Sequence, residues 1–269
     1  NAVRILDFLD SKFYFDNSFH RMNYLNIHSK RYKNFLPEFE SKISLQNIIN
    51  DKTPYLTCDR YVLLKFLEKS LSSKDIFYNK KVIQIIKDHN IIRVKFSNGS
   101  EDYCDLLISA DGIFSNSRTD NNIIKNTYFF AYRGVIKNFY SQYPMANDAI
   151  NLWLSNNKHL VTYFINNKND LSFTGVSRSS DKKNVDEENS NYSKVFSTIE
   201  FRNLFFSENK VLKEILDNAQ EVYRWPIFSL KKRVFYRDNQ IFIGDSSHGM
   251  IPFQAQGAAL AIEDAYVLY

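Results

Sequence analysis

The stretch IGDSSHGMIPFQAQGAALAIEDA, residues 243–265, decides how this chain is interpreted. Its first two residues end the apolar run QIFIG, residues 240–244, which predicts a strand, and Asp245 comes directly after that strand. A loop containing Pro252 leads to Gly257 and to an alanine-rich segment that predicts a helix over 255–269. In open α/β sheets, the turns from a strand into a helix are where cofactors bind. The stretch therefore predicts an α/β fold with a ligand site at this turn.

Three features of this turn suit a polyhydroxylated, partly anionic ring system. The Asp245 carboxylate can accept hydrogen bonds from hydroxyl groups. The helix start near Gln256, Gly257 and Ala258 presents unpaired N–H groups and the positive end of the helix dipole. Gly257 lets a flat ligand approach the backbone without a Cβ in the way. An ordinary strand–loop–helix connection explains each residue taken singly, whereas the whole series favours a cofactor site.

The composition limits the classes of protein. The chain has 269 residues, 44% of them apolar, which is enough for one or two domains with a large core. Its net charge of +5 comes from basic residues scattered among acids, so no nucleic-acid partner is expected. Cys58 and Cys104 lack metal-ligand spacing, which predicts no metal site and a reducing, cytoplasmic location. No apolar run reaches the roughly 18 residues of a membrane span, so no stable membrane insertion is expected.

The order of predicted elements suggests two domains. Helices are expected over 1–10 and over 59–71, the second with Asp59 as its N-cap, and 194–219 also has a helical pattern. Strands are expected within 21–39 with a turn near Ser29–Lys30, over 80–89, 91–100 and 102–112 with a hairpin turn at Asn98-Gly99, and repeatedly over 121–180. The polar segment 180–191 predicts a solvated loop. This order predicts an α/β domain with a mostly antiparallel sheet inserted into it.

The stretch 243–265 closely resembles the second flavin motif of the single-component FAD-dependent aromatic hydroxylases, written GDAAHxxxPxxGQG…ED. Its variant PFQAQGAALAIEDA is most similar to the salicylate and 6-hydroxynicotinate hydroxylase branch. Ser246 and Ser247 replace two alanines of the motif, and Ala255 replaces a glycine. The resemblance implies that Asp245, Pro252, Gln256, Gly257 and Ala258 bind FAD, and it leaves a structural role for His248.

Two further stretches resemble cofactor-binding motifs of the same family. DLLISADGIFSNSR, residues 105–118, is similar to the motif that touches both FAD and the nicotinamide donor, so Asp111 and Gly112 are expected to bind cofactor, with Arg118 as a further polar element. YLTCDRYVLLKFL resembles the helix start whose arginine holds the cofactor's phosphates, which gives that role to Arg60. A surface Asp-Gly turn and a solvated arginine are the plainer interpretations.

Two stretches resemble the family's substrate-binding sheet. AYRGVI places Arg133 at the position of the family's arginine, which makes it a substrate-binding candidate. WLSNNKHLVTYF resembles a strand with the pattern His-x-x-x-Tyr, here His159 and Tyr163. Positions i and i+4 of a strand point to the same face. The resemblance makes both residues catalytic candidates and Tyr163 also a substrate contact, while a sheet histidine with a core tyrosine is an equally good interpretation.

The resemblance implies a particular domain organisation. Segments 1–20, 56–120 and 237–269 would form a three-layer FAD-binding domain, and 21–55 with 121–236 the inserted substrate-binding sheet. The family opens with a strand, GxGxxG and a helix that cradle the pyrophosphate. The sequence contains no GxG and both of its ends fall within predicted helices, so we expect a fragment that lacks the first βαβ unit.

The implied activity is hydroxylation of an aromatic acid or phenol with NAD(P)H and O₂ through a flavin C4a-hydroperoxide. His159 would act as the base that deprotonates the substrate. An epoxidase or a quinone-ring hydroxylase of the same superfamily is the alternative, and a non-catalytic flavoprotein fragment is another. The expected partners are a small aromatic substrate and O₂, and a homodimer is left open.

Overall fold

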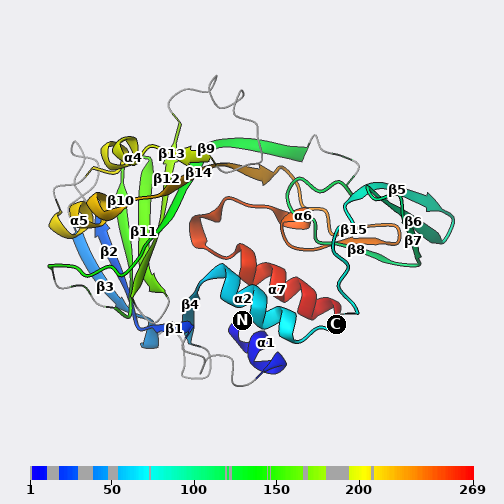
Figure 1. Ribbon diagram of the computed structural model, residues 1–269, viewed down its shortest axis with the longest axis horizontal. Coiled ribbons are helices and arrows are strands. Elements are labelled where there is room, and N and C mark those ends of the chain that lie inside the picture. Colours follow the sequence, from blue (N-terminus) through cyan, green and yellow to red (C-terminus); the bar gives the residue numbers. More distant parts are fainter. Residues whose placement is uncertain are drawn as a thin grey trace. The chain divides into compact units, whose positions relative to one another are not determined.

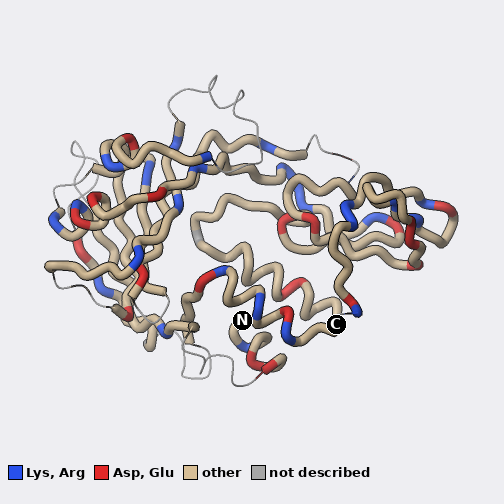
Figure 2. Tube along the Cα trace, in the orientation of Figure 1, with Lys and Arg blue, Asp and Glu red and all other residues tan. Residues whose placement is uncertain are grey.

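The computed structural model describes residues 2–10, 18–29, 39–47, 54–72, 74–118, 120, 123–143, 145, 147–165, 169–179, 194–206 and 209–269. The chain divides into two compact units. Unit 1 comprises Asn1–Ile5, Lys69–Thr127 and Phe228–Tyr269, and unit 2 comprises Leu6–Glu68 and Tyr128–Ile227. Basic and acidic residues are interspersed along both units (Figure 2).

Unit 2 is built around a mixed sheet of eight strands in the described part of the chain, with the order β13-β14-β9-β12-β11-β10-β2-β3 (Figure 1). Strands β2 and β10 pair in parallel, and the ladders β10–β11, β11–β12, β12–β9, β2–β3 and β13–β14 are antiparallel. A separate antiparallel pair joins β1 and β4. The strands are β1 (Phe19–Met22), β2 (Tyr24–Ser29), β3 (Phe39–Ser44), β4 (Tyr55–Cys58), β9 (Ile124–Ile136), β10 (Ala149–Ser155), β11 (Lys158–Ile165), β12 (Asp170–Arg178), β13 (Lys194–Phe196) and β14 (Val222–Leu230).

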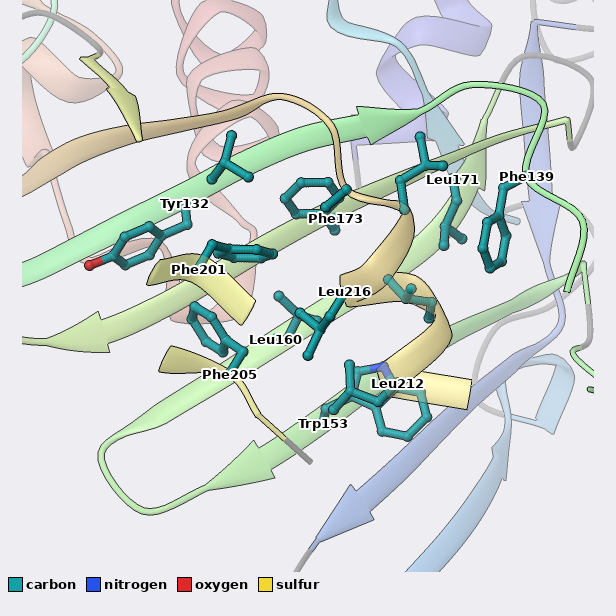
Figure 3. Close-up of a cluster of buried hydrophobic side chains, with 14 of the residues drawn as sticks. Tyr132, Phe139, Trp153, Leu160, Leu171, Phe173, Phe201, Phe205, Leu212 and Leu216 are labelled. Atoms are coloured by element: carbon teal, nitrogen blue, oxygen red, sulfur yellow. The ribbon is translucent and has the colours of Figure 1, made fainter. Parts of the chain in front are cut away.

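One face of this sheet is covered by α4 (Thr198–Leu204) and α5 (Lys210–Asn218) (Figures 1 and 3). Both helices begin at polar caps, where Ser197 accepts the Glu200 N–H and Asn209 accepts the Leu212 N–H. Between the helices and the sheet lies a large apolar core. Its buried members shown in Figure 3 include Tyr132, Trp153, Leu160, Phe173, Phe201, Phe205, Leu212 and Leu216.

Unit 1 contains two small sheets within the described residues. Strand β16 pairs in parallel with β8 and antiparallel with β15, and β5, β6 and β7 form an antiparallel sheet. The strands are β5 (Val82–Asp88), β6 (Ile91–Phe96), β7 (Glu101–Cys104), β8 (Leu107–Ser109), β15 (Tyr236–Arg237) and β16 (Gln240–Phe242). The remaining helices of the described residues are α1 (Ala2–Leu9), η2 (Leu45–Asn47), α2 (Arg60–Lys69), α6 (Asp245–His248), η4 (Pro252–Gln254) and α7 (Gly257–Leu268).

The predicted α/β (α+β) class with a mostly antiparallel inserted sheet is confirmed, and so are most element types. The helix expected over 255–269 is α7. The Asp59 carboxylate accepts the Tyr61 N–H at 2.7 Å, which makes Asp59 the N-cap of α2 as predicted. The hairpin turn at Asn98-Gly99 is present, with the Gly99 φ at +83°.

Two element predictions were wrong in detail. The segment 194–219 is not all helical, because β13 pairs with β14 before α4 begins. The run 102–112 is not one strand, because β7 pairs with β6 whereas β8 pairs with β16 in another sheet. The turn expected near Ser29–Lys30 follows the last residue of β2, and Lys30 and the whole of the loop expected over 180–191 lie outside the described residues.

The units and the predicted domains differ at some boundaries. Residues 6–20 and 56–68, which were predicted to belong to the FAD-binding domain, group with unit 2. The assignment of FAD binding to one set of segments and substrate binding to the other stays a prediction. Among the described residues, no helix has the length and apolar character needed to cross a membrane.

Candidate functional site

The turn after β16 places a free carboxylate at the start of a short helix. Gly244, at φ +59° and ψ −142°, adopts a conformation that side chains disfavour, and a Cβ there would lie 3.2 Å from the Cβ of Ala261. This glycine therefore lets the turn approach α7 closely. Asp245 follows as the first residue of α6, and its exposed carboxylate makes no hydrogen bond or ion pair with the described residues. The carboxylate is available to an external donor.

Asp264 of α7 holds this turn in place. One of its carboxylate oxygens accepts the Gly244 N–H at 2.7 Å and lies 2.6 Å from Nε2 of His248. The His248 side chain is only 9% exposed, so its bond to Asp264 is largely shielded from solvent. His248 thus ties α6 to α7, in agreement with the structural role expected for it. Asp264 lies within the sequence motif, but the sequence alone predicts no partner for it.

The start of α7 provides free hydrogen-bond donors. Helix geometry leaves the N–H groups of Gly257, Ala258 and Ala259 without an intrahelical acceptor, and the first such bond runs from Leu260 to Gln256. Gln256 is the N-cap residue, yet its side chain makes no capping bond. A Cβ built on Gly257 would have the Asp245 Oδ1 at 4.0 Å as its nearest neighbour. The site therefore combines an open positive helix end with a nearby carboxylate, preceded by Pro252 in η4.

The loop after β8 is shaped by Asp111. Its two carboxylate oxygens accept the backbone N–H and the hydroxyl of Ser117, both at 3.1 Å. Gly112 provides a φ of +79°, and no atom lies within 4 Å of the position of its absent Cβ. Asp111 thus folds its own loop, and its predicted contact with cofactor stays a prediction. Ser117 was not predicted to have a role.

Arg118 joins this loop to the turn after β16. Its guanidinium donates to the carbonyl oxygen of Ser246 at 2.7 Å and to that of Ile113 at 2.6 Å. The residue is 3% exposed, and burial lowers the pKa of its guanidinium despite the opposing effect of Asp111 and Asp120. Two loops that are more than a hundred residues apart in the sequence are therefore held together within unit 1.

Arg60 is the first residue of α2 and is exposed. A cation at a helix N-terminus is repelled by the helix dipole, so the position does not stabilise α2. Arg60 belongs to unit 2, and its predicted contact with the cofactor's phosphates stays a prediction.

The predicted substrate residues share one face of the large sheet. His159 and Tyr163 alternate along β11 with Leu160 and Phe164, which are buried in the core under α4 and α5. Arg133 pairs with Thr174, and Thr174 pairs with Val161 between the two β11 candidates. His159, Tyr163 and Arg133 therefore project from the face opposite to the two helices. This placement does not test their predicted roles.

The surroundings of these three residues differ. Burial lowers the pKa of the His159 imidazole below its ordinary value of 6.5, so the ring is neutral at neutral pH. Tyr163 packs against an apolar cluster that includes Met22 and Ile150. The Arg133 guanidinium lies 5.8 Å from the centroid of the Trp225 ring, within cation–π range. The face thus offers a neutral base and a cation. No group of three or more potential metal ligands occurs in the part of the chain that the structure describes.

Comparison with known proteins identifies the family. The family model for the FAD binding domain matches residues 61–269. The 6-hydroxynicotinate 3-monooxygenase of Bordetella bronchiseptica is 28% identical over 225 residues, which cover 80% of this chain and 56% of that protein. The salicylate hydroxylase of Pseudomonas putida is 24% identical over 209 residues, 71% of this chain and 48% of that protein. The chain spans about half the length of these curated relatives.

Solved structures share the fold. Klebsiella pneumoniae HpxO complexed with FAD and uric acid superimposes with a TM-score of 0.78 and 17% identity, covering 100% of this chain and 67% of that one. A salicylate hydroxylase substrate complex gives a TM-score of 0.77 and 17% identity, with coverage of 100% and 69%. Because the family model matches well over half of the chain and the fold agrees, the chain belongs to the FAD binding domain family.

Proposed function

We propose that this chain is part of a FAD-dependent monooxygenase that hydroxylates a small aromatic acid or phenol with NAD(P)H and O₂. The observation that carries the proposal is the turn after β16, where the Asp245 carboxylate and the donors at the start of α7 remain available to a ligand. The relatives named as monooxygenases of hydroxynicotinate and salicylate support the substrate class.

The residues of unit 1 fit FAD chemically. FAD carries hydroxyl groups, which need acceptors, and an electron-rich ring edge, which needs donors. Asp245 would accept from the hydroxyls, and the N–H groups of Gly257 and Ala258 would donate to the ring. The absence of a Cβ at Gly257 leaves room for a flat ring at this helix start. The side-chain amide of Gln256, the residue before it, would offer a further hydrogen-bonding group. The pairing of Arg60, a residue of unit 2, with a phosphate of the cofactor stays a prediction from the sequence resemblance.

FAD, when bound, supplies the electron transfer from NAD(P)H and the activation of O₂. The protein's share is to hold the reactants, to exclude water and to move a proton. The positive end of α7 would favour the negatively charged form of the cofactor. Arg133 would bind the carboxylate of an aromatic acid, with Trp225 beside its guanidinium. Tyr163, fixed by its apolar neighbours, would form one wall of the substrate site.

His159 would act as the general base. A neutral imidazole nitrogen can take the proton from a phenol oxygen, and the resulting phenolate is richer in electrons at the ring carbon to be hydroxylated. Burial lowers the pKa of His159, so the ring stays unprotonated at neutral pH and is ready to accept that proton. The same burial makes the protonated ring costly, which favours passing the proton on to solvent.

The test is a reconstitution with the full-length protein. FAD binding is followed by quenching of flavin fluorescence, and NADH or NADPH oxidation is measured with 6-hydroxynicotinate, salicylate and other hydroxylated aromatic acids. We expect one substrate to stimulate oxidation of the nicotinamide and to gain one oxygen atom from O₂, as judged by mass spectrometry with labelled O₂. Tight FAD binding without any substrate-stimulated oxidation would instead identify a non-catalytic flavoprotein, and an epoxide or hydroxyquinone product one of the superfamily alternatives.

The nicotinamide preference, the oligomeric state and the location of the protein are tested with the same full-length protein. The choice between NADH and NADPH is given by the ratio of the two kcat/KM values. The homodimer is a prediction that light scattering after size-exclusion chromatography would check, and the cytoplasmic location one that cell fractionation would check.

A further inference from the structure

The antiparallel pair of β1 and β4 lies against the end of β11 within unit 2. The hydroxyl of Thr57 in β4 donates to the carbonyl oxygen of Phe164 in β11 at 3.3 Å. Met22 of β1 is 1% exposed and belongs to the buried apolar cluster against which Tyr163 of β11 packs. These contacts define which face of the strand pair is turned towards β11.

Tyr55 lies on that same face. Cross-strand partners in an antiparallel pair project to one side, and Tyr55 is the partner of Met22. Tyr55 is also two residues from Thr57, and side chains i and i+2 of a strand share a face. The Tyr55 side chain is therefore directed towards the end of β11 that carries Tyr163, while 41% of the residue stays exposed.

The phenol groups of Tyr55 and Tyr163 are near each other and have free hydroxyls. Burial raises the pKa of Tyr55 above its ordinary value of 10.0, and the phenol of Tyr163 raises it further. Tyr55 therefore stays protonated at neutral pH and can donate a hydrogen bond. Neither hydroxyl makes a hydrogen bond with the described residues. Because a partly buried tyrosine hydroxyl usually has a partner, this pair of donors suits an acceptor carried by a ligand.

The position of the pair on the large sheet favours an acid as that ligand. Tyr163 and Val135 are both partners of Ser172, and Arg133 lies two residues before Val135 on the same face. Strand spacings of about 4.8 Å and a rise of about 3.3 Å per residue put the Cα atoms of Arg133 and Tyr163 about 12 Å apart. Both side chains are long enough to reach one carboxylate from there. Arg133 makes no ion pair with the described residues, so its charge is available to that group.

We propose that Tyr55 is a substrate-binding residue that, together with Tyr163, donates hydrogen bonds to the carboxylate of an aromatic acid. A carboxylate has about four lone-pair sites, so it can accept from both phenols and from Arg133. Hydrogen bonds from a hydroxyl to a charged oxygen are roughly twice as strong as those between neutral groups, so the tyrosine pair selects an acid over its amide. This inference rests on the proposed function, because it concerns the substrate of the same site.

The test is calorimetric titration of the full-length protein, saturated with FAD, with two matched pairs of probes. Each pair is an acid and its amide: salicylate with salicylamide, and 6-hydroxynicotinate with 6-hydroxynicotinamide. We expect at least one acid to bind, about tenfold or more tightly than its amide. Tyr55→Phe removes only the hydroxyl and should weaken binding of that acid about tenfold or more, with a much smaller loss for the amide. Tyr163→Phe should cause a similar loss, and it keeps the proposal testable if the first variant does not fold.

The matched control is Tyr140→Phe, because Tyr140 is 80% exposed and its hydroxyl makes no hydrogen bond with the described residues. It should leave acid binding unchanged. The proposal is overturned if neither acid binds, if Tyr55→Phe binds the acid as tightly as the parent, or if the control loses as much affinity. An amide that binds as tightly as its acid would overturn the choice of an acid.

Turnover separates this inference from the proposed function. With an acid that is hydroxylated, Tyr55→Phe should raise KM about tenfold and leave kcat within about threefold, because Tyr55 binds the substrate and takes no proton from it. Hydroxylation with an unchanged KM would refute the role of Tyr55 and leave the proposed function intact. Acid binding that depends on Tyr55, without any hydroxylation, would support that role and refute the proposed function.

Discussion

Replacing Asp264 by alanine should loosen the turn that carries Asp245. The Asp264 carboxylate accepts the Gly244 N–H at 2.7 Å and lies 2.6 Å from Nε2 of His248. Two hydrogen bonds to a charged acceptor, at about 1.5 kcal/mol or more each, give an expected loss of about 3 kcal/mol in the free energy of unfolding. Gly244 is buried, so water cannot easily replace the lost acceptor. That loss is a large fraction of the roughly 5–15 kcal/mol that stabilises a typical protein.

The measurement is urea unfolding of the full-length protein, with flavin dissociation as a second readout. Glu263→Ala is the matched control, because Glu263 is the neighbouring carboxylate on α7 and makes no hydrogen bond or ion pair with the described residues. It should change the unfolding free energy by no more than about 0.5 kcal/mol. Asp264→Asn should lie between parent and alanine variant, since its amide oxygen can keep one of the two bonds.

A double-mutant cycle isolates the pair itself. His248→Ala and Asp264→Ala should be strongly non-additive, with a coupling energy of about 1 kcal/mol or more, because the two side chains share one hydrogen bond. If Asp264→Ala and Glu263→Ala unfold at the same urea concentration, or if the cycle is additive, the assignment of Asp264 as the residue that holds the turn is wrong.

Three further changes test the site. Asp245→Ala should weaken FAD binding by about 1.5–3 kcal/mol while the protein keeps its stability, because the exposed carboxylate has no partner in the described part of the chain; flavin fluorescence titration against Glu263→Ala measures this. His159→Phe should slow hydroxylation about 10²–10⁴-fold with little change in FAD affinity. An equal loss in the hydroxylation rate and in the FAD affinity would identify a purely structural residue. Burial lowers the pKa of His159 in the folded protein, so just below pH 6.5 the unfolded chain takes up a proton that the folded protein does not. The unfolding free energy of the parent should therefore fall as the pH drops through this range, and that of the phenylalanine variant should lack this decline when unfolding is measured at several pH values. Ala255 has a φ of +52°, so Ala255→Gly should raise the unfolding free energy by up to about 1 kcal/mol in urea, and a lower value would show that the turn is not strained.

Much of the site could be anticipated because its signals are local in the sequence. A strand followed by Gly244-Asp245, and an alanine-rich run that starts at Gly257, predict the strand, turn and helix without any knowledge of distant residues. The hairpin at Asn98-Gly99 was predictable for the same reason, because a two-residue turn is encoded by its own backbone preferences. The shared face of His159 and Tyr163 also follows from strand periodicity alone.

What the sequence could not predict depends on partners that are distant in the chain. Lys194–Phe196 forms a strand only because β14 is available to pair with it, and the apolar run over 102–112 divides between two sheets because β6 and β16 are different partners. The helical pattern of 194–219 as a whole extended the predicted helix over Lys194–Phe196, although Val195 and Phe196 favour strand, and the apolar run over 102–112 suggested one continuous strand; tertiary pairing decides both cases.

The polar contacts of the site show the same division. The sequence by itself determined that Asp245, Gly257 and Asp264 belong to one strand–turn–helix unit, because hydrophobic periodicity and glycine positions are properties of neighbouring residues. Only the tertiary structure decided that Asp264 holds Gly244 and His248 and that Arg118 ties two loops together, because a hydrogen bond needs two atoms about 3 Å apart. Separation along the chain does not specify that distance; the packing of β8, β16 and α7 does.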